Sequence, residues 1–374
     1  FVISDVPGFF GTVVSTTVAS GRKGRSITNA LGQLLRVDEP TAIGGTADAD
    51  LGTLAAPNQP TFYIYSPQGK MVKVAQGVQN RYFLNDSLGR LLRVRQPEQE
   101  VNAGLNLSAA ITGNSQWTAG ISYDILGNVL TATDANGTTI TNTYDRANRV
   151  KTRTYSNEPA GIITSAVSFF YDGKGLNAPQ SPNYAKGKLT KVTSSVSATE
   201  YQLFDNFGRL TQSSQITDGQ TYTSKYTYNL SGALVEEEYP SGRKVRNEFE
   251  PDGDLLKVAS QKAGGSVFTP YASNFSYTAS GGISQMKLGN GKWETAKFNN
   301  RLQVTELGLG ASATNAGLWK VNYDYGELNA DGTVNTAKNT GNIARQTLTI
   351  PGTSFVQSYK YDSLYRLTEA KETT

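Results

Sequence analysis

Apolar and polar residues alternate along most of this chain, in short segments that are separated by Gly, Asn and Asp. Residues 225–228 read Lys-Tyr-Thr-Tyr, and in a strand this places both rings on one face and Thr227 on the other. Residues 234–239 alternate in the same way. No segment has the spacing of a convincing amphipathic helix. The pattern therefore predicts an all-β protein made of short antiparallel strands.

A short motif recurs where these segments end. An aromatic residue is followed by Asp, Asn or Glu, two variable residues, Gly and, after one further residue, Leu or Val. Clear copies begin at Tyr123, Tyr144, Phe204, Tyr228 and Phe249, and degenerate copies begin at Asn85, Phe298 and Tyr361. The spacing between motif starts is 21 residues from Tyr123 to Tyr144 and 24 residues from Phe204 to Tyr228. Such self-similarity is typical of a repeat protein.

Each motif has the chemistry of a hairpin turn. The aromatic residue would end one strand and bury its ring, and Asp would accept hydrogen bonds from backbone N–H groups two and three residues on. Gly would close the turn in the left-handed conformation, and Leu or Val would begin the return strand. The positions predicted to define the hairpins are Tyr123, Asp124, Gly127, Tyr144, Asp145, Phe204, Asp205, Gly208, Tyr228, Gly232, Gly253, Tyr361 and Asp362.

Three residues replace the turn glycine. Asn148 and Asn300 are interpreted as substitutes for it, because Asn tolerates the left-handed region better than most side chains. Tyr365 fits poorly at this position, so the last copy is expected to turn differently.

A second turn type is predicted at the far end of the hairpins, in residues 134–138, 239–243 and 289–292, where Gly follows Asn or Ser. Because a single hairpin cannot bury its apolar face, the hairpins are expected to pack side by side. About a dozen units would form one array over residues 1–374. Strand twist would make so wide a sheet coil, into a spiral shell or part of one.

Composition narrows the possible chemistry. Of the 374 residues, 37% are hydrophobic and 18% are charged, and the net charge is only +4, which argues against disorder. The chain has 38 Gly and 20 Tyr but no Cys and no His. This excludes disulfides, thiolate metal sites, Ser-His-Asp triads and Cys-His pairs within the chain. We therefore expect no cofactor, no metal site and no enzymatic activity.

The carboxylates of the motifs, with Asp172 among them, are interpreted as turn caps. The alternative is a pair of catalytic acids facing one cleft, and nothing in the sequence singles out such a pair. Residues 236–238 are three consecutive Glu, which alternate faces and suit a solvated edge or a cation contact. The basic group Arg22, Lys23 and Arg25 is interpreted as a surface turn, without nucleic-acid binding.

No apolar run is long enough to span a membrane. The chain opens at Phe1 and stops inside a repeat, and it is therefore expected to be a fragment of a longer polypeptide.

The copies of Tyr-Asp-x-x-Gly-Arg-Leu, with a Tyr-Pro-Ser-Gly-Arg variant at residues 239–243, resemble the tyrosine–aspartate (YD) repeats of bacterial RHS proteins. The same repeat occurs in C subunits of insecticidal toxin complexes and in teneurins. The resemblance runs from about Thr28 to the end. It implies a β-sheet that spirals into a hollow shell, which in bacteria encloses a toxic C-terminal domain and in teneurins supports adhesion. The family's plug segment with its aspartate-dependent self-cleavage site is not found, so neither cleavage nor toxicity is assigned to any residue.

The first hypothesis is a structural one. The chain would be a shell segment that encapsulates a cargo or toxin domain of the same polypeptide, with further repeats as its partners and a secreted or cell-surface location in a bacterium. The alternative is an extracellular adhesion or carbohydrate-binding module, which could assemble into a filament and would bind a glycan or receptor through Tyr residues and Trp117, Trp293 and Trp319. A carbohydrate-active β-solenoid enzyme is disfavoured by the hairpin turns.

Overall fold

The computed structural model describes residues 2–3, 11–17, 22–41, 47–108, 113–178, 181, 184–362 and 365–373. These residues form strands, turns and three short 3-10 helices, η1 (Asp48–Leu51), η2 (Ala103–Leu105) and η3 (Thr336–Lys338). The chain divides into two compact units, with the boundary between Thr223 and Ser224 inside β17. The first unit carries most of β2 to β16, and the second carries β18 to β30.

The strands are short and follow one another closely along the chain. In the first unit they are β1 (Val2–Ile3), β2 (Gly11–Thr17), β3 (Lys23–Asn29), β4 (Leu34–Glu39), β5 (Gln59–Tyr65), β6 (Met71–Gln76), β7 (Gln79–Asn85), β8 (Leu91–Arg95), β9 (Ala119–Tyr123), β10 (Val129–Thr133), β11 (Thr139–Tyr144), β12 (Val150–Ser156), β13 (Val167–Tyr171), β14 (Leu189–Thr193), β15 (Ser197–Phe204) and β16 (Leu210–Thr217). From there on they are β17 (Gln220–Tyr228), β18 (Leu234–Glu238), β19 (Lys244–Phe249), β20 (Leu255–Gln261), β21 (Thr269–Tyr277), β22 (Ile283–Leu288), β23 (Trp293–Phe298), β24 (Val304–Gly310), β25 (Trp319–Tyr325), β26 (Glu327–Leu328), β27 (Val334–Asn335), β28 (Ile343–Ile350), β29 (Thr353–Tyr361) and β30 (Leu367–Thr373).

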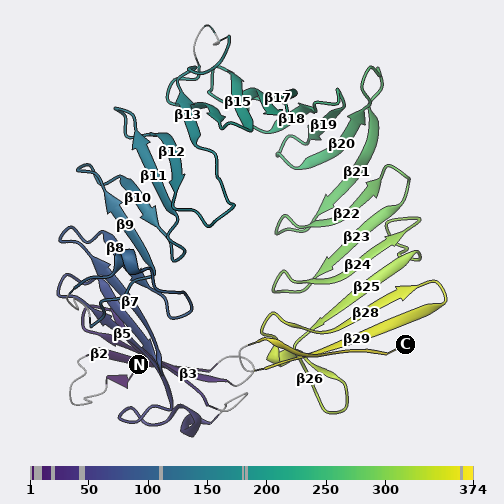
Figure 1. Ribbon diagram of the computed structural model, residues 1–374. Helices are drawn as coiled ribbons and strands as arrows, with labels where there is room; N and C mark the ends of the chain where they lie inside the picture. The colour runs from purple at the N-terminus through teal and green to yellow at the C-terminus, as the bar shows by residue number, and fades with distance from the viewer. Residues whose placement is uncertain are drawn as a thin grey trace. The chain divides into compact units, whose positions relative to one another are not determined.

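Within each unit the strands form an antiparallel meander, in which consecutive strands pair (Figure 1). The exception is β25, which pairs with β28, while β26 and β27 form a small sheet of their own. The motif turns join the two strands of one hairpin, for example β11 to β12, β19 to β20 and β23 to β24. The opposite edge carries the connections between hairpins. Successive strands rotate relative to one another in each unit, as right-handed strand twist requires. The predicted all-β class, with tandem antiparallel hairpins in a long coiling sheet, is confirmed.

The motif turns share one hydrogen-bond scheme. In the copy at Tyr123, the Asp124 N–H donates to the carbonyl of Asn128 (2.9 Å), and the Gly127 N–H donates to the carbonyl of Asp124 (3.1 Å). Asp124 Oδ1 accepts from the N–H groups of Leu126 (2.9 Å) and Asn128 (2.8 Å). The Asp124 side chain therefore accepts from the N–H groups two and four residues further along the chain. The prediction of bonds from the N–H groups two and three residues on is wrong, because the N–H of Gly127 donates to the backbone carbonyl of Asp124 instead.

The closing position of each turn is left-handed. Gly127 has φ 88°, and Asn148 occupies the same conformation at φ 59°. The interpretation of Asn300 is wrong, because Asn299 takes the Asp position and Leu302 closes the turn at φ 61°.

The last copy was expected to turn differently, and this too is wrong. Tyr365 adopts φ 61°, and its N–H donates to the carbonyl of Asp362 (2.9 Å), as in the other copies. Ser363 and Leu364 of this copy lie outside the described residues.

The far-edge turns do not form a separate type. Asp134 N–H donates to the carbonyl of Thr138 (3.0 Å), and Gly137 N–H donates to the carbonyl of Asp134 (3.1 Å). These are the bonds of the motif turn, so the expectation of a second turn type in these segments is wrong. The turns at 239–243 and 288–292 repeat the scheme. Shorter two-residue turns also occur, such as the one at Asp218 and Gly219, which both have positive φ.

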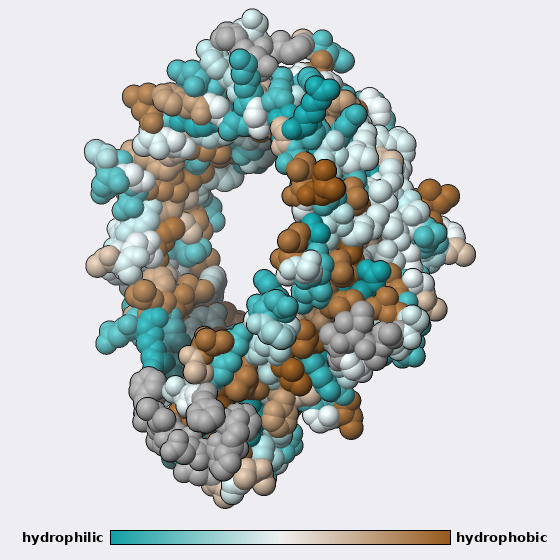
Figure 2. Space-filling model, turned by 90° about the vertical axis from the view of Figure 1, so that its left-hand side faces the viewer, coloured by the Kyte–Doolittle hydropathy of each residue, from teal (hydrophilic) through white to brown (hydrophobic). Residues whose placement is uncertain are grey.

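Side-chain burial is shallow throughout the described residues. Fully buried side chains such as Trp117 are few, and most aromatic side chains are half-buried. Figure 2 accordingly shows hydrophobic and hydrophilic residues interspersed over the visible face. A sheet of this kind gains its stability mainly from contacts between neighbouring hairpins.

The basic group at residues 22–25 does not form a surface turn as expected. Lys23 begins β3, and Arg25 pairs across the strands with Asp38, at 2.6 Å between Nε and Oδ2. Arg36 also contacts this buried carboxylate, at 2.8 Å. The two arginines compensate the charge of an aspartate that has no exposed surface.

We predict that Gly208→Val lowers the free energy of unfolding by about 2 kcal/mol, because φ at Gly208 is 74° and a β-branched residue is strained there. Denaturant unfolding measures the change. Asn148→Gly, at the same turn position of another hairpin, serves as the control and should change stability by less than about 1 kcal/mol. An unaltered unfolding curve for Gly208→Val would contradict the assignment.

Candidate functional site

The contacts that repeat along the chain lie where one hairpin meets the next. The two strands of a hairpin stay paired up to the motif turn, as Tyr144 with Val150 shows. Strands of neighbouring hairpins behave differently. The pairs between β12 and β13 are Thr152 with Ser168 and Arg153 with Val167, so the residues nearer the turn lie beyond the ladder. Neighbouring hairpins therefore part at the motif edge.

A tyrosine hydroxyl closes this gap at six of the motif positions. The motif Tyr of one hairpin donates a hydrogen bond to the backbone carbonyl of the residue that begins the return strand of the preceding hairpin. We call this contact the tyrosine bridge. It joins Tyr123 to Leu91 (2.9 Å), Tyr144 to Val129 (2.7 Å), Tyr171 to Val150 (2.9 Å), Tyr277 to Leu255 (2.8 Å), Tyr325 to Val304 (2.9 Å) and Tyr361 to Ile343 (3.0 Å).

Four of the bridging hydroxyls have a raised pKa. Burial raises the pKa of Tyr171, Tyr277, Tyr325 and Tyr361 above the ordinary value of a tyrosine. Each of these groups is therefore protonated throughout the neutral range. The hydroxyl replaces the N–H that the parted strand no longer offers to the carbonyl, and this satisfies a polar group that would otherwise lose a partner.

An asparagine makes the same link in one copy whose motif residue is Phe. At Phe249 no hydroxyl is available, and the Nδ2 group of Asn247, two residues earlier, donates to the carbonyl of Leu234 at 3.0 Å. Asn142 supplements Tyr144 in the same way, because it donates to the carbonyl of Val129 at 3.1 Å. The first residue of the return strand is thus an acceptor for side chains of the next hairpin in both kinds of copy.

The motif arginine adds a second contact between hairpins. Arg149 Nε donates to its own turn carboxylate, Asp145 (2.8 Å), while its guanidinium lies over the ring of Tyr171 in the next hairpin, 4.3 Å from the ring centre. Arg149 also binds Asp172, with 2.8 Å between Nη2 and Oδ2. Arg90 repeats the arrangement, 4.7 Å above the ring of Tyr123. One arginine therefore secures its own turn and the neighbouring aromatic ring together.

These bonds lower the pKa of the turn carboxyls. Hydrogen bonds from Arg149 hold the pKa of Asp145 below its ordinary value and lower the pKa of Asp172 to about 2. At Asp124 the side chain of Asn128 has the same effect on the pKa. All three carboxyls are ionised at neutral pH and act as acceptors.

The opposite face of the sheet carries a row of polar pairs. In seven copies the residue before the motif aromatic points away from the ring, and its side chain bonds to the directly opposed residue of the return strand. These pairs are Ser122–Thr131, Thr143–Thr152, Glu248–Lys257, Ser276–Gln285, Lys297–Glu306, Asp324–Arg345 and Lys360–Glu369. Two of the three glutamates at 236–238 form ion pairs, Glu236 with Arg246 and Glu238 with Lys225. Charges on this face are therefore largely compensated in pairs.

The predicted positions fall into two groups in space. The aromatic residues lie at the hairpin interfaces, whereas Asp124, Asp145, Asp205 and Asp362 lie in the turns beside them. No two of these carboxylates face a common cleft in the way that acid catalysis would need. The described residues contain no group of three or more His, Cys, Asp or Glu that could hold a metal ion. They also contain no helix that is long and apolar enough to cross a membrane.

Sequence reasoning missed the tyrosine hydroxyl and the motif arginine as contacts between hairpins. The sequence does contain both residue types at regular positions, because Arg and Leu follow the turn glycine in several copies and Tyr recurs one repeat later. Which Tyr contacts which Arg or carbonyl depends on the pairing of the strands, which only the structure shows.

Three cavities lie at the same place in the repeat, in the gap between parted strands. One has a volume of about 280 Å³ and is lined by Asp145, Arg149, Phe169, Tyr171 and others between β12 and β13. A second lies between β4 and β5, beside Gln33 and Tyr65.

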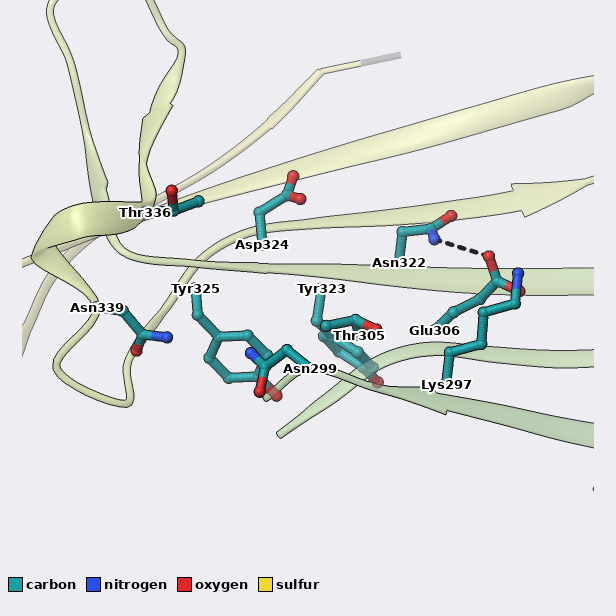
Figure 3. A pocket seen from close by; sticks show the side chains of 10 residues that line it. All are labelled: Lys297, Asn299, Thr305, Glu306, Asn322, Tyr323, Asp324, Tyr325, Thr336 and Asn339. Atoms are coloured by element: carbon teal, nitrogen blue, oxygen red, sulfur yellow. Dashed lines mark hydrogen bonds and ion pairs between the residues drawn. The ribbon is translucent and has the colours of Figure 1, made fainter. Parts of the chain in front are cut away.

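The third cavity lies in the second unit, between β24 and β25, and has a volume of about 400 Å³. Figure 3 shows the side chains that line it, which are those of Lys297, Asn299, Thr305, Glu306, Asn322, Tyr323, Asp324, Tyr325, Thr336 and Asn339.

Comparisons with known proteins identify the fold. No protein-family model matches the sequence, and no curated protein does so either. Among solved structures, the chain is similar to the Tc holotoxin pore of Photorhabdus luminescens that carries a TccC3 mutation (TM-score 0.71, 15% identity, 93% of this chain and 16% of that chain). It is similar to the TcdB2–TccC3 complex as well (TM-score 0.71, 15% identity, 93% of this chain and 17% of that chain).

These neighbours are RHS-repeat shell proteins of Tc toxins, so the resemblance inferred from the motif is confirmed at the level of the fold. The chain spans about a sixth of the length of these neighbours.

We predict that Tyr171→Phe lowers the free energy of unfolding by about 1–2 kcal/mol, because the carbonyl of Val150 loses its hydroxyl donor while the ring stays in place beneath Arg149. Chemical denaturation of the variant measures the loss. Tyr184→Phe is the control, since Tyr184 is more than a third exposed, and it should change stability by less than about 0.5 kcal/mol. Equal effects of the two substitutions would disprove the tyrosine bridge as a stabilising contact.

Stability should also fall in acid. A carboxyl whose pKa is lower in the folded chain stabilises the fold above its unfolded pKa, about 3.9, and the contribution disappears as the pH falls through the folded value. With the pKa of Asp172 at about 2, the Tm should stay level down to about pH 5 and drop between about pH 4 and 2.

Calorimetric scans over that range measure the drop. Asp145→Asn is the matched variant, because Asn229 and Asn299 already make the same turn bonds through Oδ1, and its Tm should fall less steeply with acid. A parallel fall in the variant would rule out the Asp145 carboxyl as a source of the acid sensitivity.

Proposed function

We propose that the chain is a wall segment of an RHS-type shell that encloses a cargo or toxin domain carried by the same polypeptide. The observation that supports this most directly is the tyrosine bridge, repeated from hairpin to hairpin. It joins hairpins laterally through side chains, so a long sheet can continue although its strands part at one edge. The fold shared with the Tc toxin complexes supports the same function.

Such a wall works by exclusion. Its two faces carry satisfied polar groups, with rings and arginines on one and paired charges or hydroxyls on the other. A surface of this kind offers a guest few uncompensated charges. We accordingly propose a non-enzymatic role, in which the partners are further repeats and a cargo domain of the same polypeptide, and a secreted or cell-surface location in a bacterium.

The test is electron microscopy of the longest natural polypeptide that contains these repeats, combined with limited proteolysis. We expect a closed hollow particle with density inside and a cargo domain that resists protease until the particle is unfolded. As a control, the cargo domain expressed alone should be digested at once. An open ribbon, or a cargo that is digested equally fast inside and outside the particle, would overturn the proposal.

A further inference from the structure

The cavity between β24 and β25 differs from the other two in the inserted segment that lines it. The copy that begins at Phe298 has Gln303 at the position of Arg90 and Arg149, and Gln33 takes the same position in the first unit. Gln303 does not lie over the next motif ring as Arg149 does over Tyr171. Its Oε1 accepts from Asn299 (2.8 Å) and from Asn339 (2.7 Å), and its Nε2 donates to Asn339 Oδ1 (3.3 Å). The ring of Tyr325 forms part of the cavity wall.

An insertion forms another wall of this cavity. Between β25 and β28, where most hairpins have a short motif turn, the chain forms the small sheet of β26 and β27 and the 3-10 helix η3. The insertion returns through Asn339, which is nearly buried, with 8% of its surface exposed. The Arg301 guanidinium donates to the Asn339 carbonyl (2.5 Å), and the Gly341 N–H donates to its side chain (2.9 Å). The wall is thus held in position by bonds to the preceding turn.

The charges of the cavity are already compensated. Glu306 binds Lys297 at 2.9 Å and accepts from Asn322 at 3.2 Å, the bond drawn in Figure 3. Asp324 binds Arg345 at 2.7 Å. An anion would find no excess of positive charge here, and a metal ion would have to displace both cations from the carboxylates. The lining therefore favours an uncharged ligand.

The remaining groups are those that recognise hydroxyls. The side-chain amides of Asn299 and Asn339 each keep a second N–H besides the one bonded to Gln303, and the hydroxyl of Thr305 can donate and accept hydrogen bonds. Tyr323 and Tyr325 contribute rings from the same face of β25, and Figure 3 shows both on the side of Asn299 and Thr305. Sugar rings combine many hydroxyls with apolar C–H faces that pack on aromatic rings. The volume of about 400 Å³ lies in the range of roughly 300–1,000 Å³ that is usual for small-ligand sites.

We propose that this cavity binds a neutral saccharide, with the sugar ring packed against Tyr323 and its hydroxyls bonded to the surrounding amides. The site is independent of the shell function, because all of its residues lie within the second unit. It depends on the insertion, which brings Thr336 and Asn339 to the cavity.

The test uses the full chain and a panel of neutral probes: maltose, cellobiose, lactose and N-acetylglucosamine oligomers, with a sulfated oligosaccharide as the charged comparison. Binding is measured by calorimetry and by saturation-transfer NMR. We expect at least one neutral probe to bind. Tyr323→Ala should weaken its binding by about tenfold or more through loss of the packing ring.

Gln303→Arg provides a second variant, which removes the bonds from Gln303 to Asn299 and Asn339 and places a guanidinium beside Tyr325, as Arg149 lies over Tyr171. It should weaken binding about tenfold or more, because it alters both the ring and the amides that face the ligand. Two matched controls should bind normally: Tyr359→Ala, at the same strand position of the last hairpin, and Gln33→Arg, at the same motif position in the first unit.

Three results would overturn the proposal. One is the absence of binding by every neutral probe at millimolar concentration, and another is unchanged affinity in both Tyr323→Ala and Gln303→Arg. The third is preferential, salt-sensitive binding of the sulfated probe, which would mean that the cavity selects charge. None of these results would bear on the shell, whose test concerns the enclosed cargo.

Discussion

A backbone carbonyl at the point where two strands part is the group on which this architecture depends. It lies at the start of each return strand, beyond the last backbone pair with the next hairpin. A polar group in a partly buried sheet is costly when it has no partner. The tyrosine hydroxyl of the next hairpin supplies the missing donor at Leu91, Val129 and Val150, and again in the second unit. In the copy with Phe249, Asn247 donates the corresponding hydrogen bond, so the presence of a donor matters more than the kind of side chain.

The other motif residues serve this contact. The turn aspartate fixes the hairpin end and orients the arginine, which then packs on the ring that carries the bridging hydroxyl. Single contacts of this kind contribute little, since exposed ion pairs and cation–ring contacts are each worth about 1 kcal/mol or less. Their effect comes from repetition along a sheet with few fully buried side chains, in which every hairpin is stabilised mainly by its neighbours.

Local features of the fold could be predicted from the sequence because they depend on residues close together in the chain. Alternation along strands and the Asp and Gly of each turn act within a few residues. Where two similar residues were adjacent, local reasoning chose wrongly. Asn299 and Asn300 both suit a turn, and only the hydrogen bonds show that Asn299 caps it while Leu302 closes it. Tyr365 shows that a bulky residue can be held in the left-handed region by the remaining bonds of the turn.

The tyrosine bridges could not be predicted, because they join residues that are 15 to 32 positions apart and require the register of two strands. The buried ion pair of Arg25 and Asp38 could not be predicted for the same reason, since a run of basic residues suggests an exposed turn until the partner strand is known. Gln303 likewise looks like an ordinary motif variation. Its importance is visible only beside the insertion that brings Asn339 against it.

The parting of neighbouring hairpins has a mechanical consequence. At the far edge, backbone pairing fixes the distance between strands at about 4.8 Å. At the motif edge, side chains with rotatable bonds make the link. Small changes of rotamer therefore alter the distance between neighbouring hairpins there without breaking a backbone pair. Each interface can therefore flex like a hinge whose axis runs along the far edge. The wall would be stiff against stretching on one side and compliant on the other, and it could adjust its curvature hairpin by hairpin.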